Sequence, residues 1–510
     1  MKHLSILLAA ASLLVAVAGC QKEPAGNENA ESAKAYAQFS ISYANIGTKA
    51  SMDSADGNDG YDAGTESEYA VKKATLYFVS DNLVKKILEI EGAKFTKHVE
   101  GPSGNVTYTS EIDDLEVGTY NVYATVNCDL SGIVVNTTTE TQLQESVSTA
   151  ASVPGTDLSK GIPMTSRNTE AANRVSAANA GLYAVVNITS ANTKDNPCKF
   201  ELTMERAWAK IAFVKPTTDL PVGTAANYDI TKDVYKVYDK KTGLSQIATV
   251  ALKQYKVLNQ TKTWNTFRQT CQVNSSTYIV EKHGFGAFNG GSYYDYLYDP
   301  EISNKTVAAV DAYPMTDQAA YTDLPAAGGV LAYTYENALN KVAQVVGYVT
   351  TVQFTAQLTP SLVYKMKDSN SVEEDPSYVV GNDVYFYNDV FYKDLAAVNA
   401  GAKLGVDDSN FRKFGVKKYE GGICYYNYYV RHWNNGKLPP EADALGVMEY
   451  AIVRNNSYEI TVTKVASTGD DEAVESVPTA NTPVEQVDTY FQVKLTIKPW
   501  VVRAQDAVLG

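Results

Sequence analysis

The sequence predicts an all-β protein built from more than one β-sandwich domain. Its 510 residues exceed what a single compact core holds, because domains average about 150 residues. Tyrosine is in excess, with 36 Tyr against 14 Phe and 4 Trp, and tyrosine favours strands because its ring packs on a pleated surface while its hydroxyl reaches water. Short alternating apolar runs recur along the chain, with turn-rich segments between them, which is typical of a sandwich or a barrel.

Composition and charge exclude several classes of protein. The chain is 45% hydrophobic and 20% charged, which is ordinary for a globular protein and excludes collagen-like, wholly disordered and polytopic membrane chains. It carries 44 Lys and Arg against 58 Asp and Glu, a net charge of −14. Such a chain repels phosphate backbones, so we expect no nucleic-acid partner.

The first 19 residues form an export signal. Lys2 and His3 precede an apolar run over residues 4–18, which is too short to span a bilayer. The sequence Val17-Ala18-Gly19-Cys20 resembles a bacterial lipobox, which implies cleavage before Cys20 and attachment of diacylglycerol and palmitate to it. Residues 20–34 are polar and are expected to form a tether. The alternative is an ordinary export signal in which this cysteine is incidental.

The first strand is expected within residues 35–49. Over residues 36–43 the chain alternates, with Ala37, Phe39, Ile41 and Tyr43 on one face and polar residues on the other. Residues 47–64 are rich in Asp, Gly, Ser and Asn and predict a long exposed loop. A calcium loop is the alternative there, but the acidic residues lack the spacing of one.

The later strands are divided between two domains, over residues 50–216 and 217–500. The break is placed at Pro216, because a proline in a Thr-rich turn cannot continue the strand before it. Residues 140–179 lack alternation and predict a long connection with room for a short helix. Strands are expected at residues 71–79, 120–126, 182–188, 200–214, 344–358, 383–387, 422–430, 458–465 and 490–498.

The last of these strands is the clearest. Phe491, Val493, Leu495 and Ile497 alternate with polar residues, and Pro499 ends the pattern. The tail that remains, residues 501–510, is short and largely apolar, so it is expected to need a partner.

No motif indicates catalysis or a cofactor. The chain has four His and no HExxH or GxSxG sequence, so we expect neither an enzyme nor a bound metal or cofactor. The 58 Asp and Glu leave a paired-carboxylate glycosidase open, although no spacing favours any pair. Apart from Cys20 the chain has four cysteines without a CxxC pair, and either disulfides or buried thiols fit them: Cys128, Cys198, Cys271 and Cys424.

A series of motifs, in order, gives the chain a family resemblance. The lipobox at Cys20 is followed by the strand at Tyr36, by Gly47-Thr48-Lys49-Ala50, by Pro163-Met164-Thr165, by the run MERAWAKI over residues 204–211, by Cys424-Tyr425-Tyr426 and by VRNNSY over residues 453–458. Together they resemble the stalk subunits of the type V pili of Bacteroidales, which are FimA-like and Mfa-like fimbrial lipoproteins.

The resemblance implies a specific fold and life cycle. The fold would be two tandem transthyretin-like β-sandwich domains, exported as a lipoprotein to the outer membrane and then assembled into a surface fimbrium. A surface protease would cut between Lys49 and Ala50 and remove the first strand, with Tyr36, Phe39, Ile41 and Tyr43. A strand from another copy would fill the groove, giving a head-to-tail polymer. The candidate donor is the tail, with Val501, Val502, Ala504, Val508 and Leu509.

One departure from the family concerns the cut. The best-studied family members carry arginine at the maturation site, whereas this chain offers Lys49-Ala50, and its first arginine is Arg167. The maturation protease therefore stays open, although a trypsin-like cut after lysine is chemically reasonable.

The implied function is adhesion, colonisation or biofilm formation, with pilus tip and anchor subunits and a host or bacterial surface ligand as partners. Anchor or tip subunits of the same pilus are alternatives. A different class is a surface lipoprotein that binds glycans as a monomer on tyrosine platforms. The candidate platforms are Tyr293, Tyr294, Tyr296, Tyr298 and residues 425–429.

Overall fold

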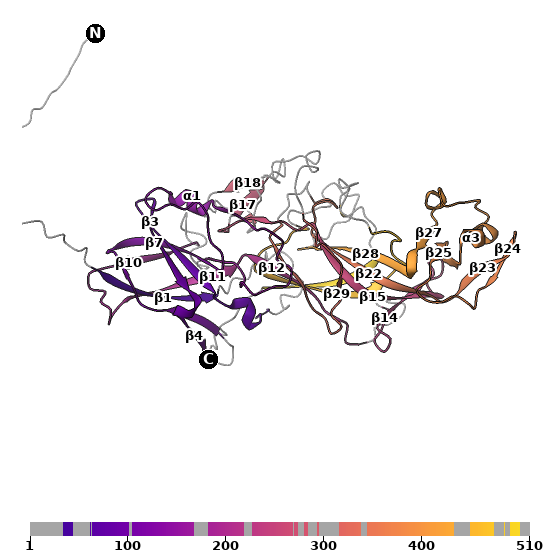
Figure 1. Cartoon of the computed structure of the whole chain (residues 1–510), viewed down its shortest axis with the longest axis horizontal. Coiled ribbons are helices and arrows are strands. Elements are labelled where there is room, and N and C mark those ends of the chain that lie inside the picture. The colour runs from indigo at the N-terminus through magenta and orange to yellow at the C-terminus, as the bar shows by residue number, and fades with distance from the viewer. Residues whose placement is uncertain are drawn as a thin grey trace, which may run out of the picture.

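The computed structural model is an elongated molecule with two large hydrophobic cores along its length (Figure 1). Strands dominate its secondary structure, as the sequence predicts. No helix among the described residues is long and apolar enough to cross a membrane. The structure describes residues 34–43, 62, 64–100, 105–167, 182–218, 227–268, 270–273, 280–283, 293–294, 316–337, 344–432, 449–473, 484 and 490–499.

The first core packs on one ten-stranded sheet with the order β3-β2-β7-β9-β11-β1-β5-β4, to which β10 adds at β7 and β6 at β1, and Trp208, Trp264, Tyr333 and Tyr335 from outside this sheet are also buried in it. Its buried residues include Leu76, Val122 and Leu202 from three different strands. The strands are β1 (Ala35–Tyr43), β2 (Lys73–Ser80), β3 (Leu83–Glu91), β4 (Phe95–Glu100), β5 (Asn105–Ser110), β6 (Asp113–Leu115), β7 (Gly118–Val126), β9 (Met164–Ser166), β10 (Ala184–Ile188) and β11 (Cys198–Arg206).

The second core lies between two sheets and is a β-sandwich. Phe213 and Ile460 from one sheet share this core with Phe354 from the other. One sheet has the order β21 (Gly329–Tyr335), β12 (Trp208–Phe213), β29 (Asn456–Val465), β30 (Phe491–Pro499). The other has the order β13 (Tyr228–Asp229), β14 (Val234–Tyr238), β15 (Gln246–Leu258), β22 (Thr351–Pro360), β28 (Ile423–Tyr429), with β20 (Thr322–Asp323) paired to β15.

A smaller unit extends the molecule beyond the second sandwich (Figure 1). It packs helix α3 (Leu395–Ala402) on a five-stranded sheet around a core of its own. The Asp394 side chain caps α3 by accepting a hydrogen bond from the Ala397 N–H at 2.8 Å. The strands are β24 (Ser371–Glu374), β23 (Val363–Asp368), β26 (Val390–Tyr392), β25 (Val384–Tyr387) and β27 (Lys417–Tyr419).

Short elements complete the described chain. Strand β8 (Val147–Thr149) pairs with β16 (Thr263–Asn265), so segments more than a hundred residues apart meet. A three-stranded sheet joins β18 (Val280–His283), β17 (Thr270–Val273) and β19 (Tyr293–Tyr294). The other helical elements are α1 (Glu140–Gln144) and the 3-10 turns η1 (Glu66–Tyr69), η2 (Gly92–Lys94), η6 (Phe411–Phe414) and η7 (Glu420–Gly422).

Most of the predicted strands are confirmed, and three expectations need correction. The expected strand at residues 200–214 is two strands, β11 and β12, separated at Ala207. The strand expected from residue 344 begins at Thr351. The connection over residues 140–179 holds the short helix α1, but it also contributes β8 and β9, whose three residues each are too few for alternation to show.

The chain passes from the first sheet to the second within the MERAWAKI run. Strand β11 pairs with β1 and β9 in the first sheet, whereas β12 pairs with β21 and β29 in the second. The change of sheet thus falls at Ala207, ahead of Pro216, and the domain boundary at residues 216–217 stays a prediction.

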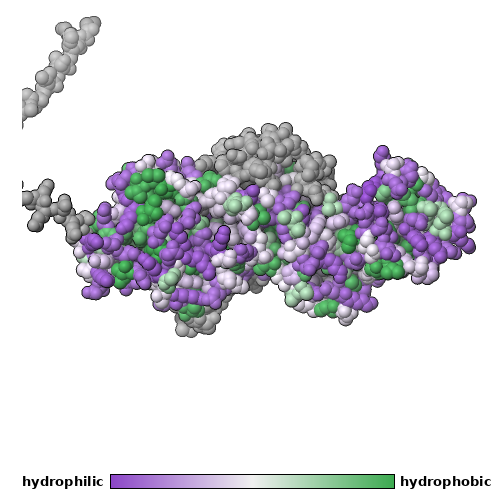
Figure 2. Space-filling model, in the orientation of Figure 1, coloured by the Kyte–Doolittle hydropathy of each residue, from purple (hydrophilic) through white to green (hydrophobic). Residues whose placement is uncertain are grey.

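Hydrophilic residues cover most of the face seen in Figure 2, with smaller hydrophobic areas between them.

Candidate functional site

Strand β1 lies inside the first sheet, between two neighbours. It runs parallel to β11, with Ala37 opposite Cys198 and Tyr43 opposite Met204. On its other side it pairs antiparallel with β5 at Ser40 and Ile41 and with β6 at residues 35–37. Because both edges of β1 are paired, removing this strand would leave a slot between β11 and β5, with free backbone groups along both sides.

The inward face of β1 is part of the first core. Ala35, Ala37, Phe39, Ile41 and Tyr43 are all buried, and Phe39 is 3% exposed. The Phe39 ring stacks on Phe200 at 5.8 Å between centroids and meets Phe95 edge-on at 5.7 Å. This alternation confirms the sequence prediction for the strand, and it makes the slot apolar along its floor.

The outward face of β1 is polar and tied to β5. The Gln38 side chain donates to the Ser110 carbonyl at 3.0 Å, and the Ser110 hydroxyl accepts from the Phe39 N–H at 3.1 Å. The hydroxyls of Ser40 and Thr109 lie 3.2 Å apart. Tyr36 also faces this side and is half-buried. These contacts fix the register of β1, since a shift by one residue would put its apolar side chains in water.

The end of β1 is held by Tyr43. Its hydroxyl donates to the carbonyl of Tyr69 in η1, and its ring lies 5.6 Å from the guanidinium carbon of Arg206. Burial holds the pKa of Tyr43 well above its usual range. Burial lowers the pKa of Arg206, whose Nε donates to the Glu68 carbonyl at 2.9 Å.

Glu68 connects η1 to the second sandwich. Its carboxylate accepts from Lys210 Nζ on β12 at 3.0 Å and from the Tyr333 hydroxyl on β21 at 2.5 Å. Lys210 also pairs with Asp62 at 2.6 Å. Burial would raise the pKa of Asp62, but the charge of Lys210 and its hydrogen bond lower it overall. The segment before β2 is thereby fixed to strands of the second sheet.

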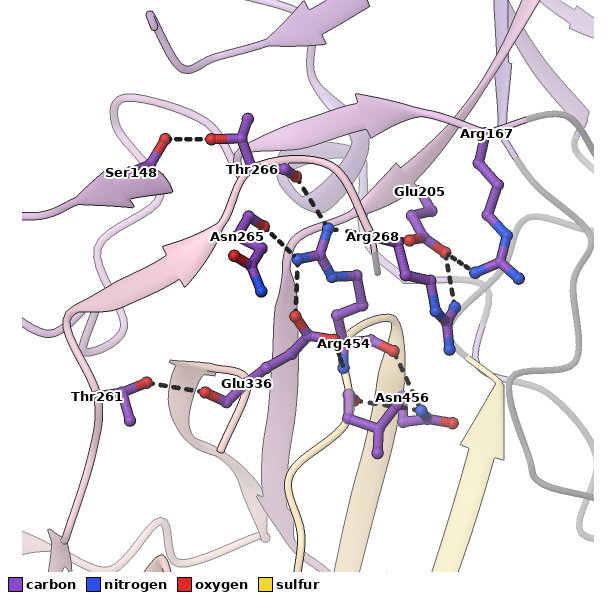
Figure 3. A network of polar contacts seen from close by, with 11 residues as sticks. Ser148, Arg167, Glu205, Thr261, Asn265, Thr266, Arg268, Glu336, Arg454 and Asn456 are labelled. Atoms are coloured by element: carbon purple, nitrogen blue, oxygen red, sulfur yellow. Dashed lines mark hydrogen bonds and ion pairs between the residues drawn. The ribbon is translucent and has the colours of Figure 1, made fainter. Parts of the chain in front are cut away.

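A second buried ion cluster joins the two cores (Figure 3). Glu205 on β11 accepts from Arg167 at 2.8 Å and from Arg268 at 2.9 Å. Arg454, two residues before β29, pairs with Glu336 at 2.7 Å and lies 3.9 Å from Glu205. The Arg454 guanidinium also donates to the carbonyls of Asn265 and Thr266. Since Glu205 and Arg206 are neighbours on β11, opposite faces of that strand serve the ion cluster and the end of β1.

These side chains form a structural site. Among the described residues, no group of His, Cys, Asp and Glu is arranged to hold a metal ion. Cys128, Cys198 and Cys424 carry free thiols, and burial raises the pKa of Cys424 to about 12, which leaves it unreactive. What the arrangement does is hold β1 between β11 and β5.

The structure places some of the sequence-predicted site residues and not others. Tyr36, Phe39, Ile41 and Tyr43 lie together on β1. Cys20, Lys49, Ala50 and the tail, with Val501, Val502, Ala504, Val508 and Leu509, lie outside the described residues. Sequence reasoning missed the roles of Glu68, Glu205, Arg206 and Lys210. A signal existed for three of these, because the MERAWAKI run places the charged residues Glu205, Arg206 and Lys210 among apolar ones.

A family model matches the C-terminal part of the chain. Residues 417–506 match the model of the C-terminal region of fimbrillin, the major fimbrial subunit protein type IV. The predicted resemblance to fimbrillins is confirmed over these residues. The matched segment covers β27 to β30, which includes the VRNNSY run and the last strand. A search of curated proteins found no match.

Solved structures with related descriptions also align with the chain. A fimbrilin (FimA) of Porphyromonas gingivalis W83 is 15% identical over 92% of this chain and 99% of its own, with a TM-score of 0.40. The tip fimbrial protein Mfa3 of Porphyromonas gingivalis is 9% identical over 91% of this chain and all (100%) of its own, with a TM-score of 0.35. A fimbrial assembly protein of Parabacteroides distasonis is 11% identical over 67% and 94%, with a TM-score of 0.30.

The fimbrillin match bears on the class of protein. The match supports the interpretation of the chain as a fimbrial subunit, a structural protein of the cell surface that assembles with other pilus subunits. Fimbrillins are structural proteins, which agrees with the expectation that the chain is not an enzyme.

Proposed function

We propose that this protein is the stalk subunit of a surface fimbria and polymerises by strand exchange. The observation that carries the proposal is the place of β1, which is paired on both edges and buried on one face, yet is joined to the rest of the chain through residues 44–61, which contain Lys49. A cut between Lys49 and Ala50 would make β1 a separate peptide, held only by noncovalent contacts.

The slot vacated by β1 would suit a strand from a second copy. Two rows of backbone N–H and C=O groups would bind the incoming backbone, and the apolar floor would bind alternate side chains. A slot at one end of an elongated molecule and a donor from another copy give a heterologous contact, which generates an open head-to-tail filament. The tail of residues 501–510 is the proposed donor.

The remaining parts of the life cycle belong to the same proposal. Lipidation of Cys20 would hold the precursor at the outer membrane, and the cut would release the lipid together with β1. Tip and anchor subunits would end the filament, and a ligand on a host or bacterial surface would be its target.

The proposed experiment starts from the purified chain without residues 1–19. We expect trypsin to cut after Lys49, and the nicked chain to form filaments in negative-stain microscopy and to elute earlier in size exclusion. Lys49→Gln, which removes the cut site and keeps a polar side chain of similar length, is the matched control and should stay monomeric. A chain ending at Trp500 should be cut but should not polymerise. Monomers from the nicked, full-length chain would disprove the stalk role.

Glycan binding is not favoured by the tyrosines of β28. Tyr426 and Tyr429 are buried, and Tyr426 donates to the Ser467 carbonyl at 2.9 Å. Tyr425 and Tyr428 are half-buried within the sheet. A sugar platform needs an exposed ring face, so these residues serve packing instead.

A further inference from the structure

The segment immediately before β2 has contacts that do not depend on β1. We define the latch as Asp62 with residues 64–69. Glu68, which is 1% exposed, binds Lys210 and Tyr333 of the second sheet. Asp62 binds the same Lys210 at 2.6 Å. Both partners lie on strands that stay in the molecule after β1 is removed.

The latch also holds its own shape. The Gly64 N–H donates to the Asp62 carboxylate at 2.8 Å, and the Thr65 N–H donates to the Glu68 carboxylate at 2.5 Å. Tyr43 of β1 touches the latch through a hydrogen bond to the Tyr69 carbonyl and a ring contact of 6.0 Å with Tyr69. Loss of β1 would remove these two contacts, whereas the ion pairs of Asp62 and Glu68 with Lys210 do not involve β1.

The chain beyond the latch offers the next site to a lysine-directed protease. No Lys or Arg occurs between Lys49 and Lys72. The Lys72 N–H donates to the Asn127 side chain at 2.7 Å, and the Lys72 carbonyl accepts from the Gly92 N–H at 2.7 Å. A protease needs a locally extended backbone, so cutting after Lys72 requires this stretch to open first.

We propose that the latch is a processing stop, which confines a lysine-directed protease to residues 44–61 and keeps β2 in the sheet after β1 has gone. This inference rests on the proposed function for the cut after Lys49. It assigns Glu68 and Lys210 a role in defining the new N-terminus of the subunit. Without the stop, the protease would continue into Lys72 and Lys73 and could strip β2 as well.

The test compares trypsin digestion of the wild-type chain with Lys210→Met and Glu68→Gln, with intact mass measured over time. The wild type should stop at a chain beginning with Ala50. Both variants should also give a chain beginning with Lys73, at a rate about 10-fold or more above the wild type, because cleavage follows the population of the open form. Lys97→Met is the matched control, since it removes the exposed ion pair between Lys97 and Glu66 in the same latch, and it should behave as wild type.

Several outcomes would overturn the proposal. One is an unchanged rate of cutting after Lys72 in both variants, and another is a wild type cut as fast after Lys72 as after Lys49. A third is the appearance, in the variants, of cuts after Lys236 and Lys256 of the second sandwich as early as cuts after Lys72. This would show that the ion pair between Glu68 and Lys210 stabilises the whole fold and not the latch alone. If the wild type is not cut after Lys49 at all, the proposed function fails. The rates of cleavage after Lys72 in wild type and variants would still test the latch.

Discussion

Phe39 offers a direct way to test whether β1 is a disposable part of the fold. It is 3% exposed and lies against Phe95 and Phe200, and Phe→Ala in a well-packed core costs about 3–5 kcal/mol. In the uncut chain, Phe39→Ala should therefore lower the free energy of unfolding of the first core by about 4 kcal/mol. That is roughly a thousandfold in the equilibrium constant. After the cut and removal of the released peptide, wild type and variant are the same molecule, so the difference should vanish.

The measurement is urea unfolding followed by tryptophan fluorescence, because Trp208 and Trp264 are buried in the first core. Phe354→Ala is the matched control. Phe354 is fully buried (0% exposed) on β22 in the second core, in a part of the chain that is retained, so its cost should be similar before and after the cut. A Phe39→Ala difference that persists after the cut would refute the reasoning, as would the absence of any loss before it.

Three further predictions concern the polar contacts. Tyr43→Phe removes the hydroxyl bond to the Tyr69 carbonyl and should destabilise only the uncut chain, by about 0.5–1.5 kcal/mol in urea unfolding; an equal loss after the cut would contradict this. Glu205→Gln leaves Arg167 and Arg268 without their carboxylate. It should lower the free energy of unfolding by about 3–5 kcal/mol in cut and uncut chains alike, and a loss of less than about 1 kcal/mol would contradict this expectation. The pKa of Asp62 is lowered from 3.8, so its contribution to stability is complete above pH 3.8 and is lost as the pH falls through the lowered pKa. The free energy of unfolding, measured against pH for wild type and Asp62→Asn, should therefore converge at low pH. Parallel curves would exclude the effect.

The sequence predicts the strands better than it predicts their partners. Alternation located β1, β29 and β30 because one face of each is apolar, and that periodicity is local. It could not show that β1 runs parallel to β11, about 160 residues away along the chain, since pairing is decided by packing against distant segments. The helix α3 was missed although its alanine-rich run and Asp394 cap are readable signals.

The charged residues at the junction illustrate a second limit. Glu205 meets Arg167, Arg268 and Arg454, which come from three separate parts of the chain. No spacing in the sequence links them, so the cluster exists only once both cores have formed. A charged residue inside an apolar strand signals a buried partner, but the identity of that partner is a tertiary fact.

The position of this cluster explains how the first sheet could lose a strand and stay folded. If β1 were removed as proposed, β11 would lose the partner that pairs with residues 198–204. The end of β11 is held independently, because Glu205 is tied to Arg167 and Arg268, and β9 pairs with Met204 to Arg206. On the opposite face, Arg206 donates to the Glu68 carbonyl, a bond that does not involve β1. The slot would thus keep one wall fixed at its end while it is empty, and a pre-formed wall lowers the ordering cost of binding the next strand.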